Sequence, residues 1–292
     1  MAAPTTTPMV WRWVRHASAR HEDAWRERLS VLGPDLVIHG RPGLAMIRLE
    51  AYSHSASLLR RVAREFGGQV TRIDCARLVA EGNAPRRPLR LARDLAVIDT
   101  NGRWPPDQPT PRVLLRIASA MAFGTGEHAT TTACLRFLRD EAATLGPGWT
   151  MLDVGTGSGI LAIAAEKFGA AAVTAFDNDP RAVAAAQGNA RRNRCTRVTL
   201  RTADIFRWSP GRAAYPVVMA NVFSEILRAA APKLRRATAP SGCLVLSGIL
   251  RGQEEETLGT FLQADLTLEK TCRRGKWVTL KLRARSRAPG RA

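Results

Sequence analysis

Closely spaced cysteines and long uncharged runs are both lacking in this sequence, and each lack argues against a class of protein. The five cysteines lie tens of residues apart and form no Cys-x-x-Cys pair, which argues against a zinc cluster of the usual spacing and against a disulfide framework. The longest stretch without a charged side chain, residues 237–250, has 14 residues, whereas a membrane-spanning helix needs about 20. The chain does not open with basic residues followed by an apolar block, so no secretory signal is expected. We therefore expect a soluble, cytoplasmic protein with no membrane partner.

What the chain does contain is an excess of arginine. Lysine and arginine number 44 against 25 acidic residues, a net charge of +19, and only five of the 44 are lysine. An excess of this size favours acidic partners such as nucleic acid or a ribonucleoprotein particle. The alternative is an arginine-rich proteome that places arginine on solvated surfaces. Residues 271–292 carry eight basic side chains and no acid, and residues 286–292 are expected to form a basic tail.

The first part of the chain has the pattern of a small α+β domain. The length of 292 residues is enough for one large or two ordinary domains. Strands are expected over residues 10–14, 36–38, 44–49 and 70–73, and helices over residues 18–32 and 55–66. This βαββαβ order is typical of a ferredoxin-like domain, which we assign to residues 1–80. Residues 81–112 are rich in proline, with four between residues 104 and 111, and are interpreted as a stiff linker.

A second, larger domain is expected over residues 113–285, where strand and helix patterns alternate as in a doubly wound, mostly parallel α/β sheet. The apolar strand 151–154 runs into a Gly-x-Gly-x-Gly turn at residues 155–159 and then into a helix. Glycines let the backbone turn tightly and approach a ligand, and the start of a helix offers free N–H groups. A dinucleotide fingerprint would need its third glycine where Ile160 stands. The observed spacing resembles instead the first motif of class I S-adenosylmethionine-dependent methyltransferases, although such a turn also serves as a plain structural corner.

Acidic side chains follow the next two expected strands. The strand 172–176 ends in Asp177, at the distance from the glycine turn at which a carboxylate meets a ribose diol. The alternative role is a helix N-cap. Because Asp179 directly precedes Pro180, we assign the cap to Asp179 and the ribose contact to Asp177. Asp204, after the following strand, either approaches an adenine or caps a turn.

An amide side chain ends a further apolar strand, at Asn221. Ligands of doubly wound sheets bind at the carboxyl ends of the strands, so Asn221 is expected to face the same crevice as Gly155 and Asp177. The alternative is an asparagine that merely forms the turn after the strand. No catalytic triad, metal cluster or P-loop is found in the sequence.

Four stretches carry a family resemblance. Residues 121–131, Met-Ala-Phe-Gly-Thr-Gly-Glu-His-Ala-Thr-Thr, resemble the AFGTGxHxTT signature of the ribosomal protein L11 methyltransferases, and they lie just upstream of the glycine turn as they do in that family. Residues 221–224 are similar to the family's N-[IL]-x-A element, residues 246–250 to its LSGIL strand, and residues 275–278 to its closing E-W-x strand. The sequence departs from the family at residues 117–120, where Ile-Ala-Ser-Ala replaces Asp-Pro-Gly.

The resemblance implies a class I methyltransferase (Rossmann-like) fold with S-adenosylmethionine as the cofactor. It also implies an enzyme that methylates lysine or N-terminal amines of a large-subunit ribosomal protein. We expect residues 1–80 to recognise that protein, and the charge excess favours a contact with ribosomal RNA through the basic surface. The cofactor-binding set carried over to this sequence is Thr131, Gly155, Gly157, Asp177 and Asn221. Asn221 is also the candidate catalytic residue. His128 either contacts the cofactor or packs so as to fix the preceding loop.

Two other functions stay open at this point. A related class I methyltransferase would act on another protein or on RNA. The basic tail favours RNA, and the absence of an Asn-Pro-Pro-aromatic element counts against it. A ribosome-binding protein that keeps the cofactor fold without turnover is the second alternative, and intact Gly155, Asp177 and Asn221 argue against it.

Overall fold

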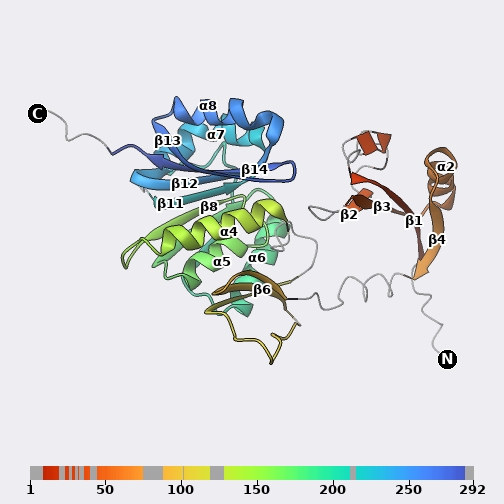
Figure 1. Cartoon of the computed structure of the whole chain (residues 1–292), viewed down its shortest axis with the longest axis horizontal. Helices are drawn as coiled ribbons and strands as arrows, with labels where there is room; N and C mark the ends of the chain where they lie inside the picture. Colours follow the sequence, from red (N-terminus) through yellow and green to blue (C-terminus); the bar gives the residue numbers. More distant parts are fainter. Residues whose placement is uncertain are drawn as a thin grey trace, which may run out of the picture. The chain divides into compact units, whose positions relative to one another are not determined.

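Two compact units, residues 1–84 and residues 85–292, make up the chain in the computed structural model (Figure 1). The structure describes residues 9–19, 24–25, 28–29, 32, 36–39, 45–74, 88–100, 102–118, 128–210 and 215–286. Much of the helix expected over residues 18–32, the glycine-containing stretch 121–127 and all but the first residue of the expected tail lie outside the described residues.

The first unit is an antiparallel four-stranded sheet. Its strands are β1 (Met9–Ser18), β2 (Leu36–His39), β3 (Met46–Ser53) and β4 (Gln69–Asp74), and they lie in the order β2-β3-β1-β4. The helix α2 (Ala56–Phe66) packs on this sheet. An antiparallel sheet with the first and third strands at its centre agrees with the predicted ferredoxin-like module.

Local sequence signals define α2 and its packing. Ser55 begins the helix by accepting a hydrogen bond from the Leu58 amide at 3.3 Å, and Gly67 ends it with a φ of 69°. The Trp13 indole N–H donates to the Gly67 carbonyl at 2.8 Å. A Cβ on Gly68 would lie 2.6 Å from the same indole nitrogen, so the turn needs glycine there. Trp13 is fully buried in a core that includes Leu29, Leu49, Ala51, Leu59 and Val62.

The second unit is built on a seven-stranded sheet in the order β10-β9-β8-β11-β12-β14-β13. Its strands are β8 (Thr150–Val154), β9 (Ala172–Asp177), β10 (Val198–Thr202), β11 (Tyr215–Asn221), β12 (Thr238–Leu250), β13 (Leu266–Arg274) and β14 (Trp277–Ala284). The first five in the sheet order are parallel, and β14 is antiparallel to both β12 and β13. The prediction of a doubly wound, mostly parallel sheet is confirmed.

Helices cover both faces of this sheet (Figure 1). The helices α4 (Ala129–Ala142), α5 (Ile160–Lys167) and α6 (Pro180–Arg192) lie over one face, and α7 (Ser224–Ala237) and α8 (Glu254–Leu262) lie over the other, after the short 3-10 helix η3 (Arg251–Gln253). Alternate residues of a strand enter different cores, since Met151 packs with the α4 and α5 side chains and Leu152 packs with those of α7. No helix among the described residues has both the length and the apolar character to cross a membrane.

The linker predicted over residues 81–112 is partly wrong. Strands β5 (Leu89–Ala92) and β6 (Leu95–Asp99) lie within it and form a three-stranded sheet with β7 (Val113–Ile117). Leu91, Leu95 and Val97 are buried in the same core as α4, so residues from about 85 onward belong to the second unit. The prolines between residues 104 and 111 do exclude regular structure there, but the apolar alternation before them carries a hairpin.

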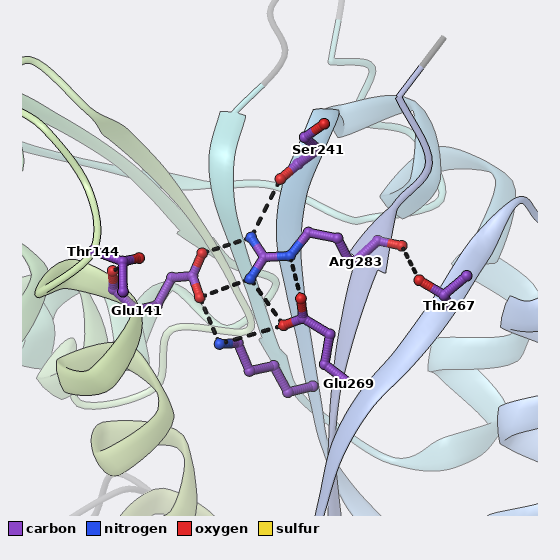
Figure 2. A network of polar contacts seen from close by, with 7 residues as sticks. Glu141, Thr144, Ser241, Thr267, Glu269 and Arg283 are labelled. Carbon is purple, nitrogen blue, oxygen red and sulfur yellow. Dashed lines mark hydrogen bonds and ion pairs between the residues drawn. The ribbon is translucent and has the colours of Figure 1, made fainter. Parts of the chain in front are cut away.

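The helix α4 is held at its far end by a network of charges on β13 and β14 (Figure 2). Glu141 is almost fully buried and accepts from both terminal nitrogens of Arg283, at 2.7 and 3.0 Å, while Lys281 Nζ lies 2.6 Å away. Arg283 also donates twice to Glu269, at 2.6 and 2.8 Å. Burial raises the pKa of Glu141, but the bonds from Arg283 and Lys281 outweigh it and hold that pKa below its usual value. The helix is therefore fixed along β14.

Candidate functional site

The glycine turn lies at the carboxyl end of β8, between β9 and β11. The amides of Gly155 and Thr156 both donate to the Phe176 carbonyl on β9, at 2.9 and 3.0 Å. Gly155 has a φ of 68°, and a Cβ there would lie 2.3 Å from Val222 Cγ1. Only glycine fits this position, because both the backbone conformation and the space exclude a side chain.

Asp177 meets this turn from the end of β9, as predicted for the end of that strand. Its Oδ2 accepts from the Gly157 amide at 2.9 Å, and its Oδ1 accepts from the Asp179 amide at 3.0 Å. The carboxylate is therefore held in one orientation beside the turn. An ionised carboxylate has about four acceptor positions, so two backbone bonds leave it able to accept from the hydroxyls of a ligand.

The other two aspartates have structural roles in the chain. Asp179 is the N-cap of α6 and accepts from the Arg181 amide at 2.8 Å, which confirms the cap assignment. Asp204 Oδ1 accepts from the Phe206 amide at 2.8 Å, which is the turn-capping role of the two alternatives left open for it. Its side chain is exposed.

Two predicted side chains, Thr131 and Asn221, carry buried oxygens with no hydrogen-bond partner among the described residues. They are Thr131 Oγ1, in the first turn of α4, and Asn221 Oδ1, at the end of β11. A buried polar atom without a partner costs roughly 1–3 kcal/mol, so such atoms are rare in native proteins and call for an explanation.

A third buried oxygen of this kind, Oδ1 of Asp153, was missed by the sequence analysis. Asp153 is fully buried in β8, and its other oxygen accepts from Thr156 Oγ1 at 2.6 Å. Burial raises the pKa of Asp153 to about 7, against the lowering effect of hydrogen bonds from Thr156 and from the Ala162 backbone. The signal was present in the sequence, because Asp153 is the one acid in an otherwise apolar strand that leads into the glycine turn.

Strand register places these three oxygens on one side of the sheet. Asp153 is in register with Met219 on β11, and Asn221 lies two residues further along the same strand, so both side chains point to the face on which Met219 lies. Met219 packs in the core that α4 covers, with Leu135 of that helix. Thr131, Asp153 and Asn221 are thus brought to the α4 face at the carboxyl edge of the sheet, next to the glycine turn.

His128 packs rather than standing free. Its ring lies edge-on to the Trp277 ring of β14, with centroids 5.1 Å apart, and its Nδ1 is 2.7 Å from Thr130 Oγ1. The span from His128 to Glu141 along α4 and the span from Trp277 to Arg283 along β14 are both about 20 Å. Since Glu141 contacts Arg283, β14 holds α4 at both ends and so fixes the position of Thr131.

The site thus combines a glycine turn and a held carboxylate with three buried oxygens that have no hydrogen-bond partner in the described part of the chain. This arrangement suits a ligand with a hydroxyl pair at one end and polar, charged groups at the other. The part of the family-like signature at residues 121–127 lies outside the described residues. No group of three or more metal-ligating side chains occurs among the residues that the structure covers.

Comparison with known proteins points in one direction. The model of the family described as Ribosomal protein L11 methyltransferase (PrmA) matches residues 69–285. A curated protein named ribosomal protein L11 methyltransferase, from Geobacter metallireducens, is 42% identical over 200 residues, which cover 68% of this chain and 62% of that protein. One of the same name from Thiobacillus denitrificans is 38% identical over 228 residues, covering 75% of this chain and 72% of that protein.

A solved structure agrees with these sequence matches. The ribosomal protein L11 methylase from Lactobacillus delbrueckii subsp. bulgaricus is 30% identical to this chain, with a TM-score of 0.61, over 68% of this chain and 100% of that one. The first three curated relatives are matched over 61% to 65% of their own length. The matched region therefore spans less than two thirds of those relatives.

Proposed function

The chain belongs to the ribosomal protein L11 methyltransferase family, and from this premise we propose that it transfers methyl groups from S-adenosylmethionine to amines of a large-subunit ribosomal protein. The observation that carries the proposal is the set of three buried oxygens without partners, on Thr131, Asp153 and Asn221, beside the glycine turn. Two of the three belong to the set that the family resemblance marks as cofactor contacts. A ribosomal substrate would place the reaction in the cytoplasm.

The residues present fit S-adenosylmethionine. Asp177 would accept from both ribose hydroxyls, and Gly155 and Gly157 would let the backbone approach the cofactor closely. The methionine end of the cofactor carries an ammonium and a carboxylate. Thr131 can offer a hydroxyl to either group, and Asp153, which has a free acceptor oxygen, can receive the ammonium.

Asn221 would be the catalytic residue in this reaction. The cofactor supplies an activated methyl group, so the protein must align an uncharged nitrogen with the methyl carbon. A free lysine has a pKa of about 10.4 and must lose a proton first, which a desolvated pocket favours. The buried Asn221 Oδ1 would accept one N–H of the amine and so direct its lone pair toward the methyl carbon.

Substrate recognition would fall to the first unit, which contains the recognition domain predicted over residues 1–80. That unit has its own sheet and core, and most of it lies outside the region matched by the family model. Binding energy from a remote module would position the target amine for the reacting site.

Contact with ribosomal RNA would come from the basic surface of the second unit. Arg191, Arg192, Arg194 and Arg197 are exposed where α6 passes into β10, and none forms an ion pair within the described chain. Arginines neutralise phosphates and release the counterions bound to them. For binding of a ribosomal RNA fragment, a plot of log Kd against the logarithm of the salt concentration should therefore be a rising straight line. Replacing all four with glutamine should reduce that slope, and an unchanged slope would remove this surface from the proposal.

Methyl transfer to whole ribosomes tests the proposed function. The protein is incubated with ribosomes and S-adenosylmethionine carrying a tritiated methyl group, and the ribosomal proteins and RNA are then separated. Label on one large-subunit protein supports the proposal. Label on RNA or on another protein would assign the enzyme a different target, and absence of label with intact ribosome binding would indicate a non-catalytic member of the family.

A further inference from the structure

The helix α6 turns two asparagines, one helical turn apart, toward the end of β7. Asn189 is 1% exposed and Asn193 is 6% exposed. Between and around them the same helix face is apolar, with Val183, Ala186 and Ala190 buried. Buried amides destabilise a protein unless their hydrogen bonds are made, so the partners of each asparagine define what it does.

The Asn193 side chain hydrogen-bonds the backbone of β7 as a neighbouring strand would. Its Oδ1 accepts from the Arg116 amide at 2.9 Å, and its Nδ2 donates to the Arg116 carbonyl at 2.7 Å. The same Nδ2 also lies 2.8 Å from the Asn189 carbonyl. Two of these bonds join the end of α6 to β7, the third stays within the helix, and none of the three reaches the glycine turn.

Asn189 joins two different segments. Its Oδ1 accepts from the Ala118 amide at 3.0 Å, just after β7, and its Nδ2 donates to the carbonyl of Ser158, inside the glycine turn, at 2.9 Å. The turn and the helix also approach closely one turn earlier in α6, because a Cβ on Gly159 would lie 2.9 Å from Ala186 Cβ. Asn189 therefore ties the glycine turn both to α6 and to the chain that leaves β7.

We propose that Asn189 is a positioning residue that sets the orientation of the glycine turn. A peptide group is planar, so a bond that fixes the Ser158 carbonyl also fixes the direction of the Gly159 N–H. That N–H donates to the Thr156 carbonyl at 2.9 Å, and α5 begins at the next residue, Ile160. One side chain thereby sets the geometry of the turn from Thr156 to the start of the helix. The consequence for cofactor affinity rests on the proposed function, whereas the consequence for the turn does not.

The matched pair Asn189→Ala and Asn193→Ala tests this role. Both changes remove a buried asparagine, Asn189 from within α6 and Asn193 from its C-cap, so only Asn189→Ala gains the full helix propensity of alanine. Asn193 makes three hydrogen bonds and Asn189 two, so stability alone predicts the larger loss for Asn193→Ala. A positioning role predicts that Asn189→Ala causes the larger loss of cofactor affinity. Asn189→Ala should weaken S-adenosylmethionine binding by about tenfold, and Asn193→Ala should weaken it by about twofold or less.

Two measurements on the full chain give the answer, namely calorimetric titration of S-adenosylmethionine and amide hydrogen exchange of residues 155–162 without cofactor. The proposal expects Asn189→Ala to show the faster exchange in this turn while Asn193→Ala shows the larger drop in melting temperature. Exchange and affinity that simply follow the melting temperature would overturn it. If the unmodified protein binds no cofactor, the proposed function fails, and the exchange order still decides the role of Asn189. If either alanine variant fails to fold, Asn189→Ser and Asn193→Ser take their places.

Discussion

A buried strand carboxylate of the first unit, Glu50, and one of the second, Asp153, differ in how far their hydrogen bonds are satisfied. In the first unit Glu50 is 2% exposed and is fully engaged, since Arg48 Nε donates to it at 2.8 Å and the Tyr52 hydroxyl donates at 2.9 Å. In the second unit Asp153 is fully buried, yet one of its oxygens has no partner among the described residues. A satisfied buried charge stabilises one arrangement of a sheet, whereas an unsatisfied one marks a place prepared for a ligand.

This contrast separates the tasks of the two units. The unpartnered oxygens of Thr131 and Asn221 lie with Asp153 at one edge of the second sheet. The first unit has no buried side-chain oxygen of this kind among its described residues, where the atoms without a hydrogen-bond partner are the Nε atoms of two arginines. Its buried apolar side chains form a core around Trp13. The proposed site for cofactor binding and methyl transfer therefore lies in the second unit, and we propose that the first unit recognises the substrate.

The largest effect should come from removing the first unit. A chain of residues 85–292 keeps β5 to β7 and both cores of the second unit, so it should fold. We expect its rate of methylation of the ribosomal protein to fall by about a hundredfold or more, because the binding energy that positions the amine is lost. The rate is measured as methyl transfer to the isolated ribosomal protein at matched enzyme concentration. Full activity of the shortened chain would break the division between the units.

Asn221→Ala should produce the next largest effect, within the second unit. We expect the methylation rate to fall by about a hundredfold, since one acceptor that aligns the amine is removed. The melting temperature should change little, because the Asn221 oxygen accepts no hydrogen bond from the residues that the structure describes. Turnover and thermal unfolding of the same preparation measure the two quantities. Normal turnover would return Asn221 to the role of a residue that only forms a turn.

Asp177→Ala should weaken S-adenosylmethionine binding by more than tenfold, because charge-assisted bonds are worth about 1.5–3 kcal/mol each. The matched control is Asp179→Ala, two residues away. It removes the N-cap of α6 and should lower stability by about 1 kcal/mol without a comparable loss of affinity. Calorimetry measures both variants. Equal affinities for the two would contradict the assignment of Asp177 to the ribose.

The smallest effect is a pH dependence of stability carried by Asp153. Burial raises its pKa to about 7 in the folded chain, whereas an unfolded aspartate titrates near 3.9. Between these values the folded state binds more protons than the unfolded state, so Asp153 makes the protein less stable as the pH rises from about 4 to about 7. Denaturant unfolding of the parent and of Asp153→Asn should show their difference in stability shrinking or reversing over this range. A difference in stability that stays constant with pH would show that folding does not raise the pKa of Asp153.

Features of the fold and the site that local sequence motifs encode could be predicted, whereas features that depend on contacts between distant residues could not. Motifs at the ends of strands placed Gly155, Asp177 and Asn221 correctly, because parallel strands bring their carboxyl ends to one edge whatever lies between them. The hairpin of β5 and β6 was missed because nearby prolines suggested a linker. The alternation of apolar residues at Leu89, Leu91, Leu95 and Val97 is the local signal for these two strands. Asp153 and the Asn189 contacts depend on burial and on pairings between distant residues, which a single sequence does not display.

Binding of S-adenosylmethionine to residues 85–292 tests the central claim most directly. Calorimetric titration of this shortened chain and of the full chain should give the same Kd within about a factor of two, since every proposed contact lies in the second unit. Asp177→Ala should lower the affinity for S-adenosylmethionine by more than tenfold in the shortened chain, the same loss that is expected in the full chain. A folded 85–292 chain that shows no binding, while the full chain binds, would contradict a cofactor site contained in the second unit.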